Sequence, residues 1–352
     1  MAIEVSFLQE GKQDPPAIAA RLADFVKSAR QSLRMAIYDF HLSDRVAAPI
    51  VAALLDRARA GVQVQLVYDA GKVGLGAWTP STVPASPETA AFVQRLGPAI
   101  ASRPITGGDP HQPRLMHHKY IVRDSTCLWT GSTNFTEDSW ALQENNIITI
   151  ESADLCRYYE TDFNELWATG DIGTTGMHDT GSVQVDGTSI FVAFSPGEGR
   201  TIDHDIAHRI TGVKRRIKMC SMLITSGGIL GALADVLAHG HVQEYGGICD
   251  RTQMESVKDQ WRGTPAQWKI GAFESVVKGL AGKNSTPYQP GSRHDFMHNK
   301  VVLVDDTVIT GSFNLSSSAT QNAENVLMIT DPALAEKYSA YIDELVARYS
   351  KN

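Results

Sequence analysis

The stretches His117-His-Lys-Tyr-Ile-Val-Arg-Asp124 and His298-Asn-Lys-Val-Val-Leu-Val-Asp305 decide the fold, because they are two copies of one pattern. Both fit His-x-Lys-x4-Asp, and the second copy follows the first by 181 residues. A Gly-Ser-x-Asn sequence comes after each copy, at 131–134 and 311–314. Because the same pieces recur in the same order, the chain is predicted to consist of two similar halves.

The similarity extends on both sides of these motifs. Glu-Asn at 144–145 matches Glu-Asn at 324–325, and the apolar runs that end in Asp69 and Asp250 also correspond. The repeat predicts an N-terminal half at 1–170, a linker rich in Gly and Thr at 171–187, and a C-terminal half at 188–352.

Apolar spacing and breaker residues place the same elements in both halves. Helices are predicted at 16–31, 44–60, 153–168, 202–213, 227–239 and 332–349. Strands are predicted at 32–38, 62–69, 120–124, 127–131, 145–150, 216–224, 245–250, 301–305, 307–311 and 325–330. Strands that alternate with helices favour two α/β halves with mixed, mostly parallel sheets.

Two long irregular stretches lie near the motif strands, at 70–87 and 281–297. Both are rich in Gly, Pro and polar residues. Long loops inside compact proteins are usually functional or disordered, and we expect these two to form walls of a substrate site.

Composition limits the possible classes of protein. The 352 residues carry 32 Lys and Arg against 39 Asp and Glu, a formal net charge of -7, which argues mildly against nonspecific DNA binding. The four cysteines stand far apart with no Cys-x-x-Cys pair, as expected of reduced thiols. Neither a secretory signal nor a transmembrane run is visible, so a cytoplasmic location is predicted, although a removed signal would leave the same sequence.

Each His-x-Lys motif is suited to binding a phosphate. Two residues at i and i+2 on a strand point to the same face. Lysine supplies a fixed positive charge, and histidine can attack phosphorus or carry a proton near neutral pH. Two copies around a pseudo-two-fold axis would place His117 and His298 on opposite sides of one phosphate. That arrangement suits in-line displacement. His118 points to the opposite face and is predicted to be structural.

The residues after each motif can support this chemistry. The Gly-Ser-x-Asn turn would bring a hydroxyl and an amide beside the same phosphate. Glu144 and Glu324 each follow that Asn by ten residues, and each could accept the second ring N–H of a histidine, which would fix the tautomer.

Paired His-x-Lys-x4-Asp motifs followed by Gly-Ser-x-Asn and a carboxylate resemble the signature of the phospholipase D superfamily, and the resemblance covers essentially the whole chain. The second motif is also similar to the small bacterial nucleases of that superfamily. The resemblance implies one active site at the interface of the two halves, a covalent phosphohistidine intermediate and no metal or other cofactor.

The resemblance also implies a role for each matching residue. His117 would be the nucleophile, and His298 would be the acid that later acts as a base. The phosphate ligands would be Lys119, Lys300, Asn134 and Asn314, with Ser132 and Ser312 nearby. Glu144 and Glu324 would orient the histidines. The motif aspartates Asp124 and Asp305 belong to the same set, and we interpret them as bracing the motif.

The substrate class stays open at this point. Phospholipid cleavage with headgroup release is favoured by the net charge, and transfer to an alcohol could follow from the same intermediate. The alternative is an endonuclease that cleaves DNA or RNA. A phosphate-binding module without catalysis would not need to keep both histidines. Two motifs in one chain complete one site, so a monomer is expected.

Overall fold

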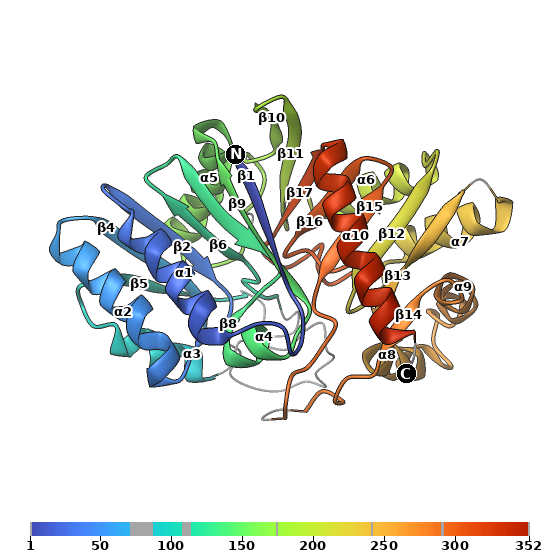
Figure 1. Ribbon diagram of the computed structural model, residues 1–352, viewed down its shortest axis with the longest axis horizontal. Helices are drawn as coiled ribbons and strands as arrows, with labels where there is room; N and C mark the ends of the chain where they lie inside the picture. The colour runs from blue at the N-terminus through green and yellow to red at the C-terminus, as the bar shows by residue number, and fades with distance from the viewer. Residues whose placement is uncertain are drawn as a thin grey trace.

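The computed structural model describes residues 2–70, 87–107, 114–173, 175–240, 242–289 and 292–350. These form two large mixed sheets, one from each half of the chain (Figure 1). The first sheet has the spatial order β1 (Ile3–Leu8), β9 (Asn145–Glu151), β7 (Cys127–Gly131), β6 (Lys119–Arg123), β2 (Ser32–Ile37), β4 (Gln63–Asp69) and β5 (Ala101–Ile105). The second has the order β10 (Gly181–Val185), β11 (Thr188–Ser195), β17 (Glu324–Thr330), β16 (Thr307–Gly311), β15 (Lys300–Val304), β12 (Arg216–Ser221), β13 (Glu244–Asp250) and β14 (Ala281–Lys283). A short pair joins β3 (Phe40–His41) to β8 (Phe135–Thr136).

The two sheets repeat each other, which confirms the predicted α/β class and the two similar halves. The run β9-β7-β6-β2-β4-β5 in the first sheet corresponds to β17-β16-β15-β12-β13-β14 in the second. The expectation of mostly parallel sheets is wrong. The parallel pairs are β2–β4, β4–β5, β12–β13 and β13–β14, and the other neighbours run antiparallel. Each motif strand returns through a tight turn, and tight turns join antiparallel strands.

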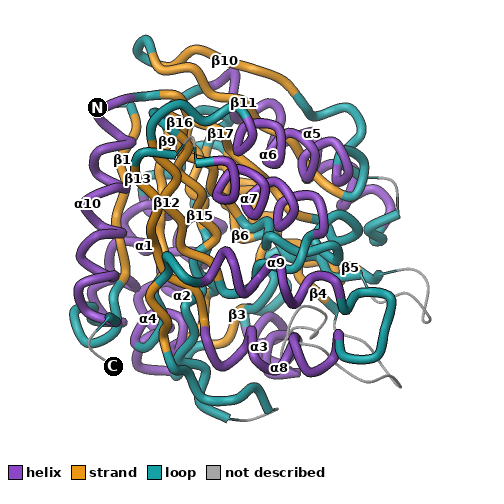
Figure 2. Tube along the Cα trace, turned by 90° about the vertical axis from the view of Figure 1, so that its right-hand side faces the viewer, coloured by secondary structure: helices purple, strands orange, loops and turns teal. Residues whose placement is uncertain are grey.

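Helices form three layers around the sheets. The middle layer consists of α5 (Ala153–Thr169) and α10 (Pro332–Tyr349), whose apolar faces share one core with strands of both sheets. The first sheet's outer face is covered by α1 (Pro15–Lys27), α2 (Asp44–Arg59), α3 (Pro87–Arg95) and α4 (Glu137–Ala141). The second sheet's outer face is covered by α6 (Gly199–Thr211), α7 (Gly227–His239), α8 (Arg251–Trp261) and α9 (Trp268–Val277), of which α6, α7 and α9 face the viewer in Figure 2.

The two middle helices begin in the same way. The side chains of Ser152 and Asp331 accept hydrogen bonds from the backbone N–H groups of Leu155 and Leu334, three residues on. Such caps satisfy N–H groups that a helix start leaves without partners. Both helices follow the last strand of their half, so each half closes on the shared core.

The predicted linker contains a strand of the second sheet. Its residues 181–185 form β10, which pairs with β11 and therefore belongs to the second sheet. The predicted loop 281–297 likewise begins with β14, and residues 71–86 of the other predicted loop lie outside the described residues. All four cysteines are free and buried. In the described part of the chain, no helix combines the length and the apolar content that crossing a membrane requires.

Candidate active site

The two motifs meet where the halves interlock. Each motif lysine opens a strand, Lys119 in β6 and Lys300 in β15. The backbone N–H of His117 donates to the carbonyl of Ala323 at 2.9 Å, and the N–H of His298 donates to the carbonyl of Glu144 at 3.1 Å. Each histidine is thus held by a residue of the opposite half, so neither half alone can build the site.

A carboxylate stands behind His117. Its Nδ1 lies 2.7 Å from Oε2 of Glu324, and both side chains are buried. Asn322 donates to the other carboxylate oxygen at 3.2 Å, and the side chain of Ser312 also bonds this carboxylate. With Nδ1 engaged in this way, Nε2 is the ring atom left for chemistry.

An amide stands behind His298 instead. Its Nδ1 lies 3.0 Å from Oδ1 of Asn145, and Ser132 donates its hydroxyl to the same oxygen at 2.7 Å. The Nδ2 group of Asn145 donates to Oγ of Ser139 at 3.1 Å and to Oε1 of Gln143 at 3.3 Å. These acceptors fix the amide with its oxygen toward the ring.

The expectation that Glu144 orients a histidine needs correction, because the repeat shifts by one residue before β9. Gly131 pairs with Ile147 in the first sheet, and Gly311 pairs with Val326 in the second. Counting back along both strands places Glu144 at the position of Ala323 and Asn145 at the position of Glu324. The segment between the Gly-Ser-x-Asn turn and the strand is one residue longer in the first half, where it contains α4.

Glu144 belongs to a buried ion cluster beside the site. Its Oε2 lies 2.6 Å from Nζ of Lys283, and its Oε1 accepts a hydrogen bond from Tyr349. Lys283 also lies 3.1 Å from a carboxylate oxygen of Glu10 and donates to the carbonyl of Leu142 at 2.9 Å. The cluster ties the N-terminal segment, both halves and the C-terminal helix together.

The two motif lysines are buried next to the histidines. Lys119 donates to the carbonyl of His117 at 2.6 Å, and its Nζ lies 4.7 Å from the ring centroid of Tyr38. Lys300 donates to the carbonyl of His298 at 2.7 Å and lies 3.2 Å from the Nε2 of that histidine. Burial lowers the pKa of Lys119 to about 7 and lowers the pKa of Lys300 well below its usual range.

The histidines are held neutral by their surroundings. Burial, followed by the charges of Lys119 and Lys300, lowers the pKa of both His117 and His298 well below the ordinary value. Burial raises the pKa of Glu324 to about 7, against the opposing charge of Lys119. A bound anion would reverse the lysine and histidine shifts, because an opposite charge nearby favours the protonated, cationic forms. The cluster is therefore suited to a bound anion.

The Gly-Ser-x-Asn turns divide into two roles. Ser132 and Ser312 contact the residues behind the histidines, as described above, which places their hydroxyls in support of the rings. Asn134 and Asn314 each keep a buried side-chain oxygen without a partner among the described residues. Such polar groups are suited to a ligand or water in the site.

The motif aspartates lie at the far ends of the motif strands. Asp124 accepts from the backbone N–H groups of residues 30–32 at 2.7 to 3.1 Å. Asp305 accepts from those of residues 214–216 at 2.8 to 3.4 Å. Both aspartates have left-handed backbone conformations, with φ of 53° and 52°. Each aspartate thus joins the turn after its motif strand to the start of the neighbouring strand, β2 or β12.

Two further aspartates were visible in the repeat without a role. Asp69 ends β4 and accepts from the backbone N–H of Met116 at 2.7 Å, and Asp250 ends β13 and accepts from Met297 at 3.0 Å. Each therefore holds the residue just before a motif histidine. The sequence did contain a signal for this role, because each aspartate ends an apolar run at the corresponding place of its half.

His118 is fully buried on the other side of the strand from His117. Its Nε2 lies 3.2 Å from a carboxylate oxygen of Asp162, and its Nδ1 lies 3.2 Å from Nδ2 of Asn325. These contacts join α5 to β17 and agree with a structural role.

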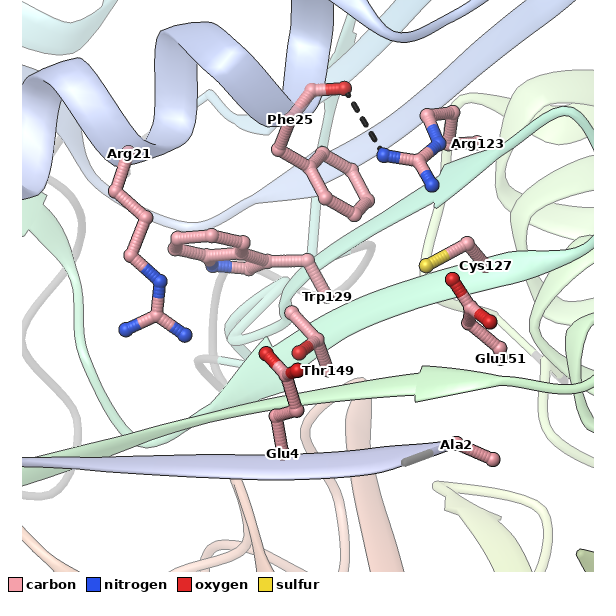
Figure 3. Close-up of a pocket in the computed structure, with 9 residues that line it drawn as sticks. All are labelled: Ala2, Glu4, Arg21, Phe25, Arg123, Cys127, Trp129, Thr149 and Glu151. Carbon is pink, nitrogen blue, oxygen red and sulfur yellow. Dashed lines mark hydrogen bonds between the residues drawn. The ribbon is translucent and has the colours of Figure 1, made fainter.

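A separate hollow of about 200 Å³ lies on the outer side of the first sheet, under α1 (Figure 3). Two aromatic side chains that line the hollow each contact an arginine. The guanidinium of Arg21 lies 5.2 Å from the Trp129 ring, and that of Arg123 lies 4.5 Å from the Phe25 ring. None of the residues that line it comes from the set that surrounds the two motif histidines.

Comparisons with known proteins agree with the repeat. The family described as "Cardiolipin synthase, PLD-like domain" matches residues 22–167 and 206–346. A phospholipase D of Rickettsia bellii is 30% identical over 171 residues, which cover 48% of this chain and 73% of that protein. A mitochondrial cardiolipin hydrolase of Xenopus laevis is 26% identical over 156 residues, or 44% of this chain. The match spans 63% of the length of that hydrolase, just under two thirds.

A solved structure shares the fold over nearly the whole chain. The phosphatidylserine synthase of Haemophilus influenzae superposes with a TM-score of 0.65 at 13% identity, covering 98% of this chain and 86% of that one. The family match falls once on each half and takes in both motifs. The chain therefore belongs to the phospholipase D superfamily.

Proposed function

We propose that this protein hydrolyses phosphodiesters through a covalent phosphohistidine, and that its substrates are phospholipids from which it releases the headgroup. The observation that carries the proposal is the pair of buried histidines, one from each half. Each is anchored through Nδ1 and flanked by a buried lysine. A single chain supplies both histidines, so a monomer completes the site.

The first step forms the phosphohistidine. Nε2 of His117 bonds to phosphorus while the bond from phosphorus to the headgroup oxygen breaks, and His298 gives its Nε2 proton to that oxygen. The attack leaves a positive charge on the His117 ring, which the carboxylate of Glu324 stabilises. Lys119 and Lys300 balance the phosphate charge, so the step needs no metal ion.

The second step returns the enzyme to its starting state. A water molecule attacks phosphorus, its proton passes to His298, and the phosphorus–nitrogen bond to His117 breaks. The product is a phosphate monoester that keeps the diacylglycerol. An alcohol in place of water would give a new diester by the same route.

Phospholipids are favoured over nucleic acids for two reasons. The chain carries a net charge of -7, which disfavours a polyanionic strand. The curated relatives described above bear the names phospholipase D and cardiolipin hydrolase. Both observations support a lipid substrate, with the phosphate bound between the two motifs.

A parallel assay in EDTA tests the proposal. One arm offers vesicles of phosphatidylcholine, phosphatidylethanolamine or cardiolipin and measures the released headgroup. The other offers labelled single-stranded DNA and RNA, and His117→Ala serves as the blank for both. Headgroup release alone is expected. Strand cleavage alone would make the protein a nuclease, and no turnover in either arm would overturn the proposal.

A further inference from the structure

The residue behind His298 differs in kind from the residue behind His117. We propose that Asn145 is a positioning residue that restricts His298 to acid–base work, so that the covalent bond to phosphorus forms on His117 alone. This inference rests on the proposed function, which already assigns the attack to His117, and adds the residue that keeps His298 out of the covalent step.

The two halves place different groups at one equivalent position. Asn145 and Glu324 both stand two residues before the residue that pairs with the glycine of the Gly-Ser-x-Asn turn. Each contacts Nδ1 of the histidine from the opposite half, at 3.0 Å and 2.7 Å. The two halves therefore differ in the side chain that contacts Nδ1 of each histidine ring.

The neighbouring positions are also unequal. Tyr38 directly follows β2, and its ring lies against His117 with centroids 4.7 Å apart. Met222 directly follows β12, the equivalent strand of the second half. His117 thus contacts a carboxylate and an aromatic ring, whereas His298 contacts an amide and the second half has a methionine at the position that matches Tyr38.

The amide is locked and cannot ionise. Its Nδ2 group faces the acceptors on Ser139 and Gln143, and its oxygen takes the hydroxyl of Ser132. A flip would set Nδ2 against the Ser132 hydroxyl and leave its oxygen facing Oε1 of Gln143. The oxygen is therefore held toward His298, where it accepts the Nδ1 proton and leaves Nε2 to exchange protons.

The difference in charge assigns the roles. Bond formation from nitrogen to phosphorus leaves a cationic ring, which an adjacent carboxylate stabilises and an amide stabilises far less. A proton donor works better when its protonated form is not over-stabilised. The carboxylate therefore favours attack by His117, and the amide favours proton transfer by His298.

The neighbouring charged groups that shift the pKa of His298 are lysines and histidines, which are positive when protonated. Lys300, Lys119, His117 and His294 all disfavour its protonated form, after burial. The negative charge of a bound phosphodiester opposes them, so His298 gains its proton together with the substrate. The alkaline limb of the plot of kcat against pH then reports the loss of the proton from His298 in the enzyme–substrate complex.

Asn145→Asp places a carboxylate behind His298 with little change in size, and Asn146→Asp is the matched control. Asn146 is a buried amide on the same strand, and its side chain contacts Asn299 and Thr310. With dihexanoylphosphatidylcholine, Asn145→Asp is expected to move the alkaline limb of kcat up by about one pH unit. Asn146→Asp is expected to leave the limb in place.

Peptide mapping after alkaline quench gives a second readout, which starts with the wild-type protein. In the wild-type protein, the phosphatidyl group is expected on His117 and not on His298. In the charge-swapped variant Asn145→Asp with Glu324→Gln, we expect it on His298. Label on both histidines of the wild type, or an unmoved limb in Asn145→Asp, would overturn the inference. An absence of label on either wild-type histidine during turnover would instead contradict the covalent mechanism itself.

Discussion

The carboxylate of Glu324 lies 2.7 Å from Nδ1 of His117, and the two residues come from opposite halves of the chain. The contact is buried and joins the end of one sheet to the motif of the other. In the second copy of the arrangement, Asn145 contacts His298. The active site is thus two-fold in its backbone and asymmetric in its chemistry.

Glu324→Gln and Glu144→Gln are expected to differ sharply in turnover. Loss of the carboxylate behind His117 removes the stabilisation of the cationic ring, so kcat for phospholipid cleavage should fall by roughly 100-fold or more. Glu144→Gln should keep kcat near the wild-type value per folded molecule, because its carboxylate contacts Lys283 and Tyr349. A larger loss of kcat in Glu144→Gln would contradict the one-residue shift.

Glu144→Gln should instead reduce stability. Its carboxylate is fully buried against Lys283, and breaking a buried ion pair from one side typically costs about 3 kcal/mol or more. Urea unfolding measures the loss. The double variant with Lys283→Met removes both charges and should recover part of it, whereas strictly additive losses would show that the pair is not coupled.

Asp124→Ala and Asp305→Ala are expected to destabilise the protein by similar amounts. Each aspartate accepts three consecutive backbone N–H groups, and their loss should cost about 2 kcal/mol or more. Asp186→Ala is the matched control, because Asp186 is exposed and also has a positive φ of 47°. Equal melting temperatures for all three variants would show that backbone conformation, rather than hydrogen bonding, sets the cost.

The affinity for substrate should depend on pH through Lys119. Burial lowers the pKa of this lysine to about 7, so its charge is present below that pH and is lost above it. KM for dihexanoylphosphatidylcholine should therefore rise between pH 7 and pH 9, by up to about tenfold per unit. Lys119→Arg keeps its charge throughout and should show a smaller rise in KM; some rise is expected to remain, because Glu324, whose pKa burial raises to about 7, also ionises in this range. An equal rise in that variant would assign the dependence to another group.

Activity is expected to survive chelation. In the proposed mechanism the two lysines provide the positive charge that a metal ion would otherwise supply at the phosphate, and His298 provides the proton for the leaving group. Headgroup release is measured after dialysis against EDTA, with and without added zinc or magnesium. Loss of turnover on dialysis with recovery on adding either ion would contradict a metal-free mechanism.

The repeat made most of the fold predictable. The helix predicted at 227–239 has those bounds in the structure, and the strand predicted at 145–150 lies within β9. Short elements such as β5 and α4 were not predicted, because five residues carry too little periodicity. The mostly parallel sheet was wrong because the prediction weighed strand–helix alternation above the tight turns after Asp124 and Asp305.

The sequence predicted the residues of the two motifs, but not which residue contacts Nδ1 of His298. The matched letters Glu144-Asn145 and Glu324-Asn325 favoured one alignment, whereas strand pairing shows that Asn146 corresponds to Asn325. An insertion of one residue before a strand changes which side chain faces the site, and sequence identity alone does not reveal it. The partners of Lys283 also depend on packing between the halves, which no local pattern encodes.

A burst experiment tests the covalent mechanism most directly. Bis(p-nitrophenyl) phosphate carries a leaving group that departs without a proton, so attack by His117 needs no acid. His298→Ala should therefore release one nitrophenolate per site in a rapid burst and then stall, because the base for hydrolysis is missing. His117→Ala should show no burst. A burst in His117→Ala with none in His298→Ala would reverse the roles, and steady release without a burst in both would contradict the phosphohistidine.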